Sequence, residues 1–394
     1  MAGNGSNKGS GDFLTALREQ RPLRNLVVLA ALTAIVVIAA IVAVSGAQRS
    51  VATDFEPKPL FAGLADRLDK VQSIEYTFSR GLQGTDNIVI TRKGDGIWRL
   101  PSRDGYPADT KLVKKALLGL SEMEAYEPRT ANKKWHRNLG LLAPEDLGSA
   151  IRVSLKDADG KSMASLLVGH VPDRTVDAGG QGVIYVRRDG EDQTWLARGR
   201  LPLFKKVNAW LAPDFLGLDK KDIKSMTLWS GTGHPVVLNR ETPETEHFSI
   251  ANLPEGRVSR GGPVLDGGAT VLAGAQFDDV LKADQLNFPD TSPVVTLTTY
   301  DGLKLTLVMS GAGSGLWAKI DVATTEDAAE NDAAKDRAKA LRARVDGWAY
   351  KMPSKVTTQV TQTMDLLTRA NTALDDEVRG VMDGAGRPGG QAAE

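Results

Sequence analysis

Residues 151–168 read IRVSLKDADGKSMASLLV, two apolar segments separated by a short polar stretch. Residues 151–155 and 165–168 are rich in branched aliphatic side chains, which favour strands. Between them, Asp159-Gly160 is a dipeptide typical of tight hairpin turns. Residues 294–308, VVTLTTYDGLKLTLV, repeat the pattern with Asp301-Gly302 at the turn. The sequence therefore predicts two antiparallel hairpins of one kind, one in each half of the chain.

Further strands and one helix are expected around each hairpin, in the same order. In the first half the patterns predict strands at 74–78, 88–91, 97–100, 184–186 and 195–197, and a helix at 109–123 capped by Asp109 or Thr110. In the second half they predict strands at 223–228 and 236–238, and a helix at 269–281. We predict an α+β fold of two tandem, duplicated, mainly antiparallel units, residues 61–212 and 221–325. The alternative is a chance self-alignment, since mixed α+β proteins resemble themselves loosely.

Residues 26–44, LVVLAALTAIVVIAAIVAV, form the longest apolar run of the chain. A helix of this length spans about 28 Å, close to the thickness of a bilayer core, so we predict a single N-terminal transmembrane helix. The preceding residues carry more basic than acidic side chains, which favours a cytoplasmic N-terminus, with the bulk of the chain in the periplasm of a bacterial inner membrane. A signal peptide cleaved after Ala47 is the alternative. Residues 1–25 are expected to be a disordered tail and 45–60 a stalk.

The end of the chain differs in composition from both units. Residues 326–378 are expected to be a helical region, with one helix over 354–374, and residues 379–394 a flexible tail. Between the second unit and that helix lies a short aromatic segment containing Trp348 and Tyr350. Because this segment falls outside both predicted units, these two aromatic residues are candidate contacts with a partner.

The composition excludes several kinds of chemistry. With 49 basic and 49 acidic residues the chain has no net charge, which argues against nucleic-acid binding. It has no cysteine, so disulfides and thiolate metal sites are excluded. The four histidines follow no metal-binding spacing, and His136 is expected to be exposed. No catalytic, cofactor-binding or metal-binding residue is predicted, and the protein is not expected to be an enzyme.

Two groups of residues resemble functional motifs, but an ordinary structural role is expected for each. The glycines at 311, 313 and 315 resemble a phosphate-binding loop, but no helix follows, so a hairpin loop is expected. Asp278 and Asp279 are adjacent in the sequence, and Asp104 and Asp109 lie five residues apart. Such neighbouring carboxylates are of the kind that glycosidases use. Without a sign of a cleft, solvated loop carboxylates are expected instead.

Several segments taken together resemble a bacterial envelope family. They include PLFAGL at 59–64, YPAD at 106–109, LGL at 139–141, VIYVR at 183–187 and WLA at 195–197. In this order they are similar to the family called domain of unknown function 4340, over about residues 59–350. The resemblance implies an inner-membrane anchor and an association with auxiliary subunits of gliding-type ABC transporters. It implies no catalytic residues.

The expected function is therefore that of a non-enzymatic, membrane-anchored periplasmic accessory or scaffold subunit of an ABC-type transport system. Its expected partners are the lipid bilayer and a transporter permease or gliding-type auxiliary subunit. One alternative is a periplasmic module that binds a glycan or lipid between the two units. The other alternative is an anchored hydrolase.

Overall fold

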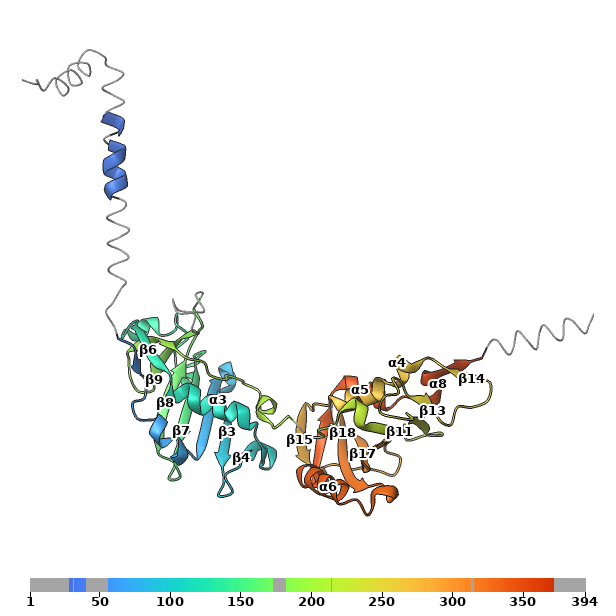
Figure 1. Ribbon diagram of the computed structural model, residues 1–394. Coiled ribbons are helices and arrows are strands. Elements are labelled where there is room, and N and C mark those ends of the chain that lie inside the picture. Colours follow the sequence, from blue (N-terminus) through green and yellow to red (C-terminus); the bar gives the residue numbers. More distant parts are fainter. Residues whose placement is uncertain are drawn as a thin grey trace, which may run out of the picture.

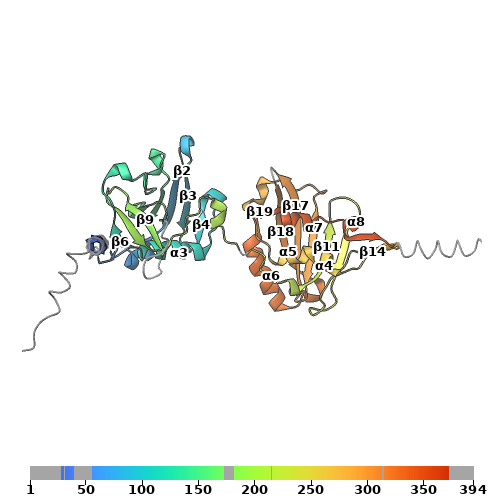
Figure 2. The same cartoon turned by 90° about the horizontal axis from the view of Figure 1, so that it is seen from above.

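A computed structural model describes residues 28–30, 32–39, 56–172, 182–213, 215–312 and 315–371. The chain folds into two lobes that lie side by side, the first ending near residue 212 and the second beginning near residue 215 (Figures 1 and 2). Each lobe is built on one β-sheet, and every pairing among the described strands is antiparallel. The coarse prediction of a mixed α+β fold with antiparallel sheets is confirmed.

The sheet of the first lobe has ten strands in the order β1-β6-β10-β9-β8-β7-β2-β3-β4-β5. Alternate side chains of its central strand β2 are buried, as expected for a sheet that packs a core on one face. The strands are β1 (Lys58–Pro59), β2 (Ser73–Ser79), β3 (Thr85–Arg92), β4 (Trp98–Leu100), β5 (Tyr106–Pro107), β6 (Glu124–Pro128), β7 (Ile151–Lys156), β8 (Ser162–Val168), β9 (Val183–Arg188) and β10 (Thr194–Arg198).

The sheet of the second lobe has eight strands in the order β13-β12-β11-β16-β17-β18-β19-β15. A separate two-stranded ribbon joins β14 (Arg257–Ser259) to β20 (Thr368–Ala370). The eight strands are β11 (Ile223–Trp229), β12 (Val236–Asn239), β13 (Ser249–Ile250), β15 (Asp279–Lys282), β16 (Val294–Thr299), β17 (Leu303–Ala312), β18 (Gly315–Thr324) and β19 (Trp348–Met352).

The two sheets share one topology. Along the first sheet the order from β6 is β6-β10-β9-β8-β7-β2-β3-β4, and along the second it is β15-β19-β18-β17-β16-β11-β12-β13. Each strand of one series has its counterpart at the same position of the other, and the helices before β6 and β15 also correspond. The predicted hairpins are the pairs β7·β8 and β16·β17, which lie at equivalent places. A duplication of one ancestral unit stays a prediction.

Helix α3 (Thr110–Ser121) lies across one face of the first sheet (Figure 1). The side chain of Asp109 accepts hydrogen bonds from the amides of Lys111 and Leu112, as the predicted cap requires. The helix buries Val113, Ala116 and Leu120, which recur at the spacing of one helix face. The predicted helix is therefore confirmed, together with its cap.

The corresponding helix of the second lobe is shorter than predicted. Helix α5 (Gly267–Ala273) follows the four-residue helix α4 (Gly262–Leu265) and ends at Gly274. The prediction of a helix over 269–281 is wrong for its last residues, because 279–282 form β15. This strand pairs with β19, so a partner distant in sequence overrides the local helical pattern.

The C-terminal region belongs to the second lobe rather than to a separate helical region. Helix α6 (Asp332–Val345) packs on β18 through Ala334, Ala338, Leu341 and Val345, and the chain then adds β19 to the sheet. The predicted end of the second unit at residue 325 is therefore too early. The single helix predicted over 354–374 is also wrong, because the chain forms α7 (Ser354–Val360), α8 (Met364–Leu367) and β20. Four threonines between 357 and 363 weaken the helix there.

Residues 28–30 and 32–39 are helical and exposed. The rest of the predicted span 26–44, the tail 1–25, the stalk up to residue 55 and the tail 379–394 lie outside the described residues. Within the part of the chain that the structure describes, no helix is long and apolar enough to cross a membrane.

Candidate functional site

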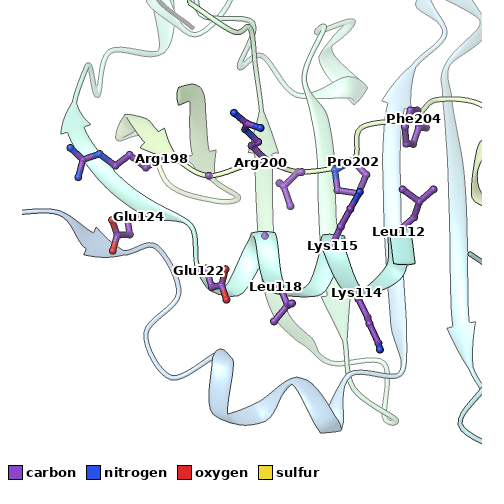
Figure 3. A pocket seen from close by; sticks show the side chains of 13 residues that line it. Leu112, Lys114, Lys115, Leu118, Glu122, Glu124, Arg198, Arg200, Pro202 and Phe204 are labelled. Carbon is purple, nitrogen blue, oxygen red and sulfur yellow. The ribbon is translucent and has the colours of Figure 1, made fainter. Parts of the chain in front are cut away.

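A groove lies beside helix α3 in the first lobe (Figure 3). It has a volume of about 840 Å³ and runs between α3 and the segment that leaves β10. We call it the α3 groove. Its lining residues are Leu112, Lys114, Lys115, Leu118, Gly119, Glu122, Glu124, Arg198, Gly199, Arg200, Leu201, Pro202 and Phe204.

A close backbone approach at Gly119 sets the shape of the groove. A Cβ atom at Gly119 would lie 2.2 Å from the carbonyl oxygen of Arg200 and 3.2 Å from the Leu201 side chain. Only glycine lets the segment after β10 pass so near to the helix. This close approach fixes where the segment crosses α3 and so positions one bank of the groove.

The floor of the groove is apolar, and two of its large side chains are exposed. Leu112, Leu201 and Pro202 are partly buried, whereas Leu118 is 48% and Phe204 45% exposed. Phe204 is held in place because its carbonyl accepts a hydrogen bond from the buried indole of Trp210, and the two rings meet edge to face at 6.0 Å. An exposed apolar pair in a hollow is a feature of binding surfaces.

The rim of the groove is mainly basic. Lys114 and Lys115 on α3 and Arg200 on the opposite bank are exposed, and none of them forms an ion pair with a described residue. Glu122 and Glu124 lie at the other end, where Arg198 stacks over the ring of Tyr126 at 4.0 Å. Lys205 and Lys206 directly follow Phe204 and are exposed as well. The basic side chains therefore lie mainly on the side of the groove that carries Phe204, while Leu118 stands one helical turn from both Lys114 and Glu122.

The two lobes meet through a cluster of aromatic rings, the interlobe cluster, formed by Tyr106, Phe215, Phe277, Trp348 and Tyr350. The ring of Tyr106, from the first lobe, meets Trp348 at 5.0 Å, Phe277 at 5.8 Å and Tyr350 at 6.1 Å between centroids. Phe215 lies 4.6 Å from Tyr350 and 5.2 Å from Phe277. Buried apolar side chains on both sides continue this cluster into the cores of the lobes.

This position places Trp348 and Tyr350 within the fold, and a contact of either ring with a partner stays a prediction. Both lie in β19, inside the second sheet, and both face Tyr106 of the first lobe. Tyr350 has no exposed surface and Trp348 is partly buried, so their main contacts are within the chain. The placement of residues 348–352 outside the second unit is wrong, because the strand pairs with β18 and β15.

Three of the acidic residues singled out in the sequence lie at this contact between the lobes. Arg103 donates to both carboxylate oxygens of Asp279 at 2.5 and 2.9 Å, and the Asp104 carboxylate accepts from Gln285 at 3.1 Å. Asn208 donates to the carbonyl of Asp278 at 2.7 Å. The carboxylates of Asp279 and Asp104 are therefore engaged across the lobes, and that of Asp109 caps α3. The pocket at the contact, lined by Asp109, Asn208 and Phe277 among others, has a volume of only about 190 Å³.

The structure brings together polar groups that the sequence did not indicate. The buried carboxylate of Asp266 accepts from Lys220 at 2.7 Å and from the amide of Phe248 at 3.0 Å, and it lies 3.0 Å from Nδ1 of His247. Burial raises the pKa of Asp266, but these hydrogen bonds outweigh it and hold the pKa below its ordinary value. The partners come from residues 18 to 46 positions away, so no local pattern could reveal them.

Two other histidines have definite partners. His136 is only 3% exposed, and its Nε2 lies 2.9 Å from the carbonyl oxygen of Asp192, so the prediction of an exposed residue is wrong. Nε2 of His170 lies 3.3 Å from Oγ of Ser149 on the exposed surface. This distance is long for an activated nucleophile and its base. Among the described residues, no three histidine, aspartate or glutamate side chains gather closely enough to hold a metal ion.

The glycine-rich segment at 311–315 connects two paired strands. Strands β17 and β18 pair up to the contact of Ala312 with Gly315. The expected hairpin is confirmed by this pairing, and residues 313 and 314 lie outside the described residues. The segment therefore lacks the strand-to-helix arrangement of a phosphate-binding loop.

Comparison with known proteins supports the resemblance read from the sequence. The model of the family described as "Domain of unknown function (DUF4340)" matches residues 98–287. No curated protein and no solved structure matches the chain. The matched segment includes helix α3, the α3 groove, the linker between the lobes and the first strands of the second sheet. Over this segment, the chain is similar to the DUF4340 family.

Proposed function

We propose that the protein is a non-enzymatic accessory or scaffold subunit, anchored by residues 26–44 in a bacterial inner membrane, with both lobes in the periplasm. The length and apolar character of that stretch, and the basic excess before it, support the anchor and its orientation. The family resemblance favours an ABC-type transport system, with a permease or auxiliary subunit as partner. The α3 groove is the binding surface of the membrane-proximal lobe.

The observation that carries the proposal is the interlobe cluster. A scaffold has to hold separate surfaces at a fixed spacing, and two lobes joined only by a linker would not do so. Here five aromatic rings and the ion pair of Arg103 with Asp279 join the lobes into one body. A buried, largely apolar contact of this kind resists relative motion of the lobes.

The same contact weighs against a ligand site between the lobes. A glycan or a lipid needs a cavity of at least about 300 Å³. The aromatic rings fill the contact, and the pocket at its edge is smaller than that. The α3 groove is large enough, but it lies on one lobe rather than between the two.

Purification of the full chain from its own membranes in mild detergent tests the proposed role. We expect integral membrane subunits to be recovered with the wild-type chain in fixed ratio, and to be depleted with Tyr106→Ala, which loosens the contact between lobes. Tyr185→Ala is the matched control, because Tyr185 lies in β9, and its ring stacks with Arg129 of the same lobe. Recovery of the wild-type chain alone would contradict the proposal.

Labelling tests the orientation separately. The chain has no cysteine, so single cysteines can be introduced at Ser6 and at the exposed Asp159 in the β7–β8 turn. In spheroplasts, an impermeant maleimide should label Asp159→Cys, and it should label Ser6→Cys only after permeabilisation. The reverse pattern would overturn the proposed topology.

A further inference from the structure

The α3 groove combines two features that together indicate its occupant. Leu118 and Phe204 stand exposed on its two banks, and Lys114, Lys115 and Arg200 surround them without ion-pair partners among the described residues. Figure 3 shows Lys115 beside Pro202, and Lys114 on the same helix. Basic side chains around exposed apolar ones suit a ligand surface that is anionic outside and apolar beneath.

The path of the chain places this lobe near the proposed anchor. Strand β1 pairs with β6, and Glu124 of β6 lines the groove. Only residues 45–57 separate the predicted span from β1. Even fully extended, this segment reaches at most about 45 Å, roughly the size of the lobe itself. The tether therefore keeps the first lobe within about 45 Å of the proposed anchor, which raises the effective concentration of lipid around that lobe.

We propose that the α3 groove binds the anionic phospholipid surface of the membrane that holds the anchor. Phosphate groups contact Lys114, Lys115 and Arg200, while Leu118 and Phe204 enter the boundary between headgroups and acyl chains. This proposal rests on the proposed anchor and adds a second, electrostatic contact to it. Glu122 and Glu124 lie beyond Leu118 toward the end of α3, so they limit the contact to the side of the groove that carries Lys114, Lys115 and Phe204.

The lysines favour lipid over an acidic peptide as the occupant. A lysine ammonium is a point charge that donates to an anion from many directions, which suits a fluid surface of phosphates, whereas the arginine fork suits a single anion held in fixed geometry. The one arginine of the groove with a described stacking partner, Arg198, is engaged with Tyr126 at the acidic end. The charges that remain exposed around the apolar pair come mainly from lysines: Lys114, Lys115, Lys205 and Lys206.

Lipid quenching in nanodiscs tests the proposal with the full chain. Single cysteines replace Leu118 or Phe204 and carry an environment-sensitive fluorophore, and the nanodiscs contain a quencher attached to the lipid. Leu253→Cys is the matched control, since Leu253 is also an exposed leucine, 41% accessible, but lies in the second lobe. We expect quenching at 118 and 204 in phosphatidylglycerol nanodiscs, little in phosphatidylcholine nanodiscs, and none at 253 in either.

Replacing the lysines of the groove by glutamine measures how much their charge contributes to the lipid contact. Each lysine near an anionic surface changes the equilibrium between contact and release about fivefold. Lys114→Gln with Lys115→Gln should therefore weaken the contact about 25-fold, and added salt should weaken it further. The control pair Lys133→Gln with Lys134→Gln removes two exposed lysines of the same lobe outside the groove and should leave the quenching unchanged.

The outcomes separate this proposal from the anchor. Failure of the chain to enter nanodiscs refutes the anchor alone, and the labelled chain is then mixed with anionic vesicles, where the same quenching is expected. Equal quenching at 118 and 253, or no response to phosphatidylglycerol, overturns the lipid proposal. Photo-crosslinking from position 118 to a membrane protein, without lipid quenching, would instead assign the groove to a protein partner.

Discussion

Tyr106→Ala tests whether the two lobes form one body. The ring of Tyr106 is buried, belongs to the first lobe, and meets three rings of the second lobe edge to face. Each such aromatic pair contributes about 0.5–1.5 kcal/mol beyond the burial of its area. Truncation of a buried aromatic side chain to alanine costs about 3–5 kcal/mol. We expect about 3 kcal/mol of this loss to fall on the contact between lobes.

Hydrogen exchange on the full chain in detergent measures this loss locally. Because the second-lobe side of the contact is β19, amides at 348–352 should open more often when Tyr106 is truncated. A loss of about 3 kcal/mol corresponds to exchange about 150-fold faster. Amides of β7 and β16, in the middle of the two sheets, should change far less.

Tyr185→Ala is the control that separates a loosened contact between the lobes from a general loss of stability in the first lobe. Tyr185→Ala removes a half-buried ring of the first lobe that has no described ring contact with the second lobe. It should destabilise the first lobe and leave exchange at 348–352 unchanged. If Tyr106→Ala leaves exchange there unchanged, or if both variants accelerate it equally, the interlobe cluster does not couple the lobes and the argument for a rigid scaffold fails.

Three further predictions concern stability. Asp109→Ala removes the cap of helix α3 and should lower the free energy of unfolding, measured in urea, by about 1 kcal/mol. Asp109→Asn keeps a capping side chain and should lower it much less. Equal losses for the two variants would show that the cap is unimportant. Gly302→Ala should lower the free energy of unfolding by more than about 2 kcal/mol, because φ is +92° and a new Cβ would lie 2.1 Å from that of Ala328. Gly160→Ala, with φ of +76° and open space around the new Cβ, should lower it by about 1 kcal/mol. Thermal unfolding of the two variants measures the difference. The pKa of Asp266 in the folded protein lies below its unfolded value of about 4, so the ionised carboxylate stabilises the fold above that pH, and this stabilisation is lost as the pH falls through the folded pKa. Asp266→Asn should therefore make the free energy of unfolding fall less steeply at acid pH. An unchanged slope at acid pH would refute this.

Local sequence patterns predicted most of the regular elements. The hairpin β7·β8 follows from two apolar segments and one Asp-Gly turn, all within 18 residues, and α3 follows from a cap and one apolar face. Such elements are decided by neighbours in sequence, so a single sequence contains the information for them. The errors lie where a distant strand competes with a local pattern, as at β15, where a predicted helix gave way to pairing with β19.

The candidate site was not predicted from the sequence. The α3 groove needs the contact of Gly119 with Arg200, two residues far apart in the chain, and nothing near either one marks it. Trp348 and Tyr350 were noticed as aromatic residues, but their role depends on Tyr106, more than 200 positions earlier. Residue type indicated that they pack against something, and the structure shows what they pack against.

By itself, then, the sequence determined the α+β class, the hairpins, the capped helix and the apolar stretch at 26–44, because turn dipeptides, caps and periodicity act over a few residues. The tertiary structure alone decided that residues 348–352 complete the second sheet and that five rings join the lobes. It also decided that a basic, apolar groove opens beside α3. These features depend on pairing and packing between distant segments, whose partners are chosen by the burial of the whole chain.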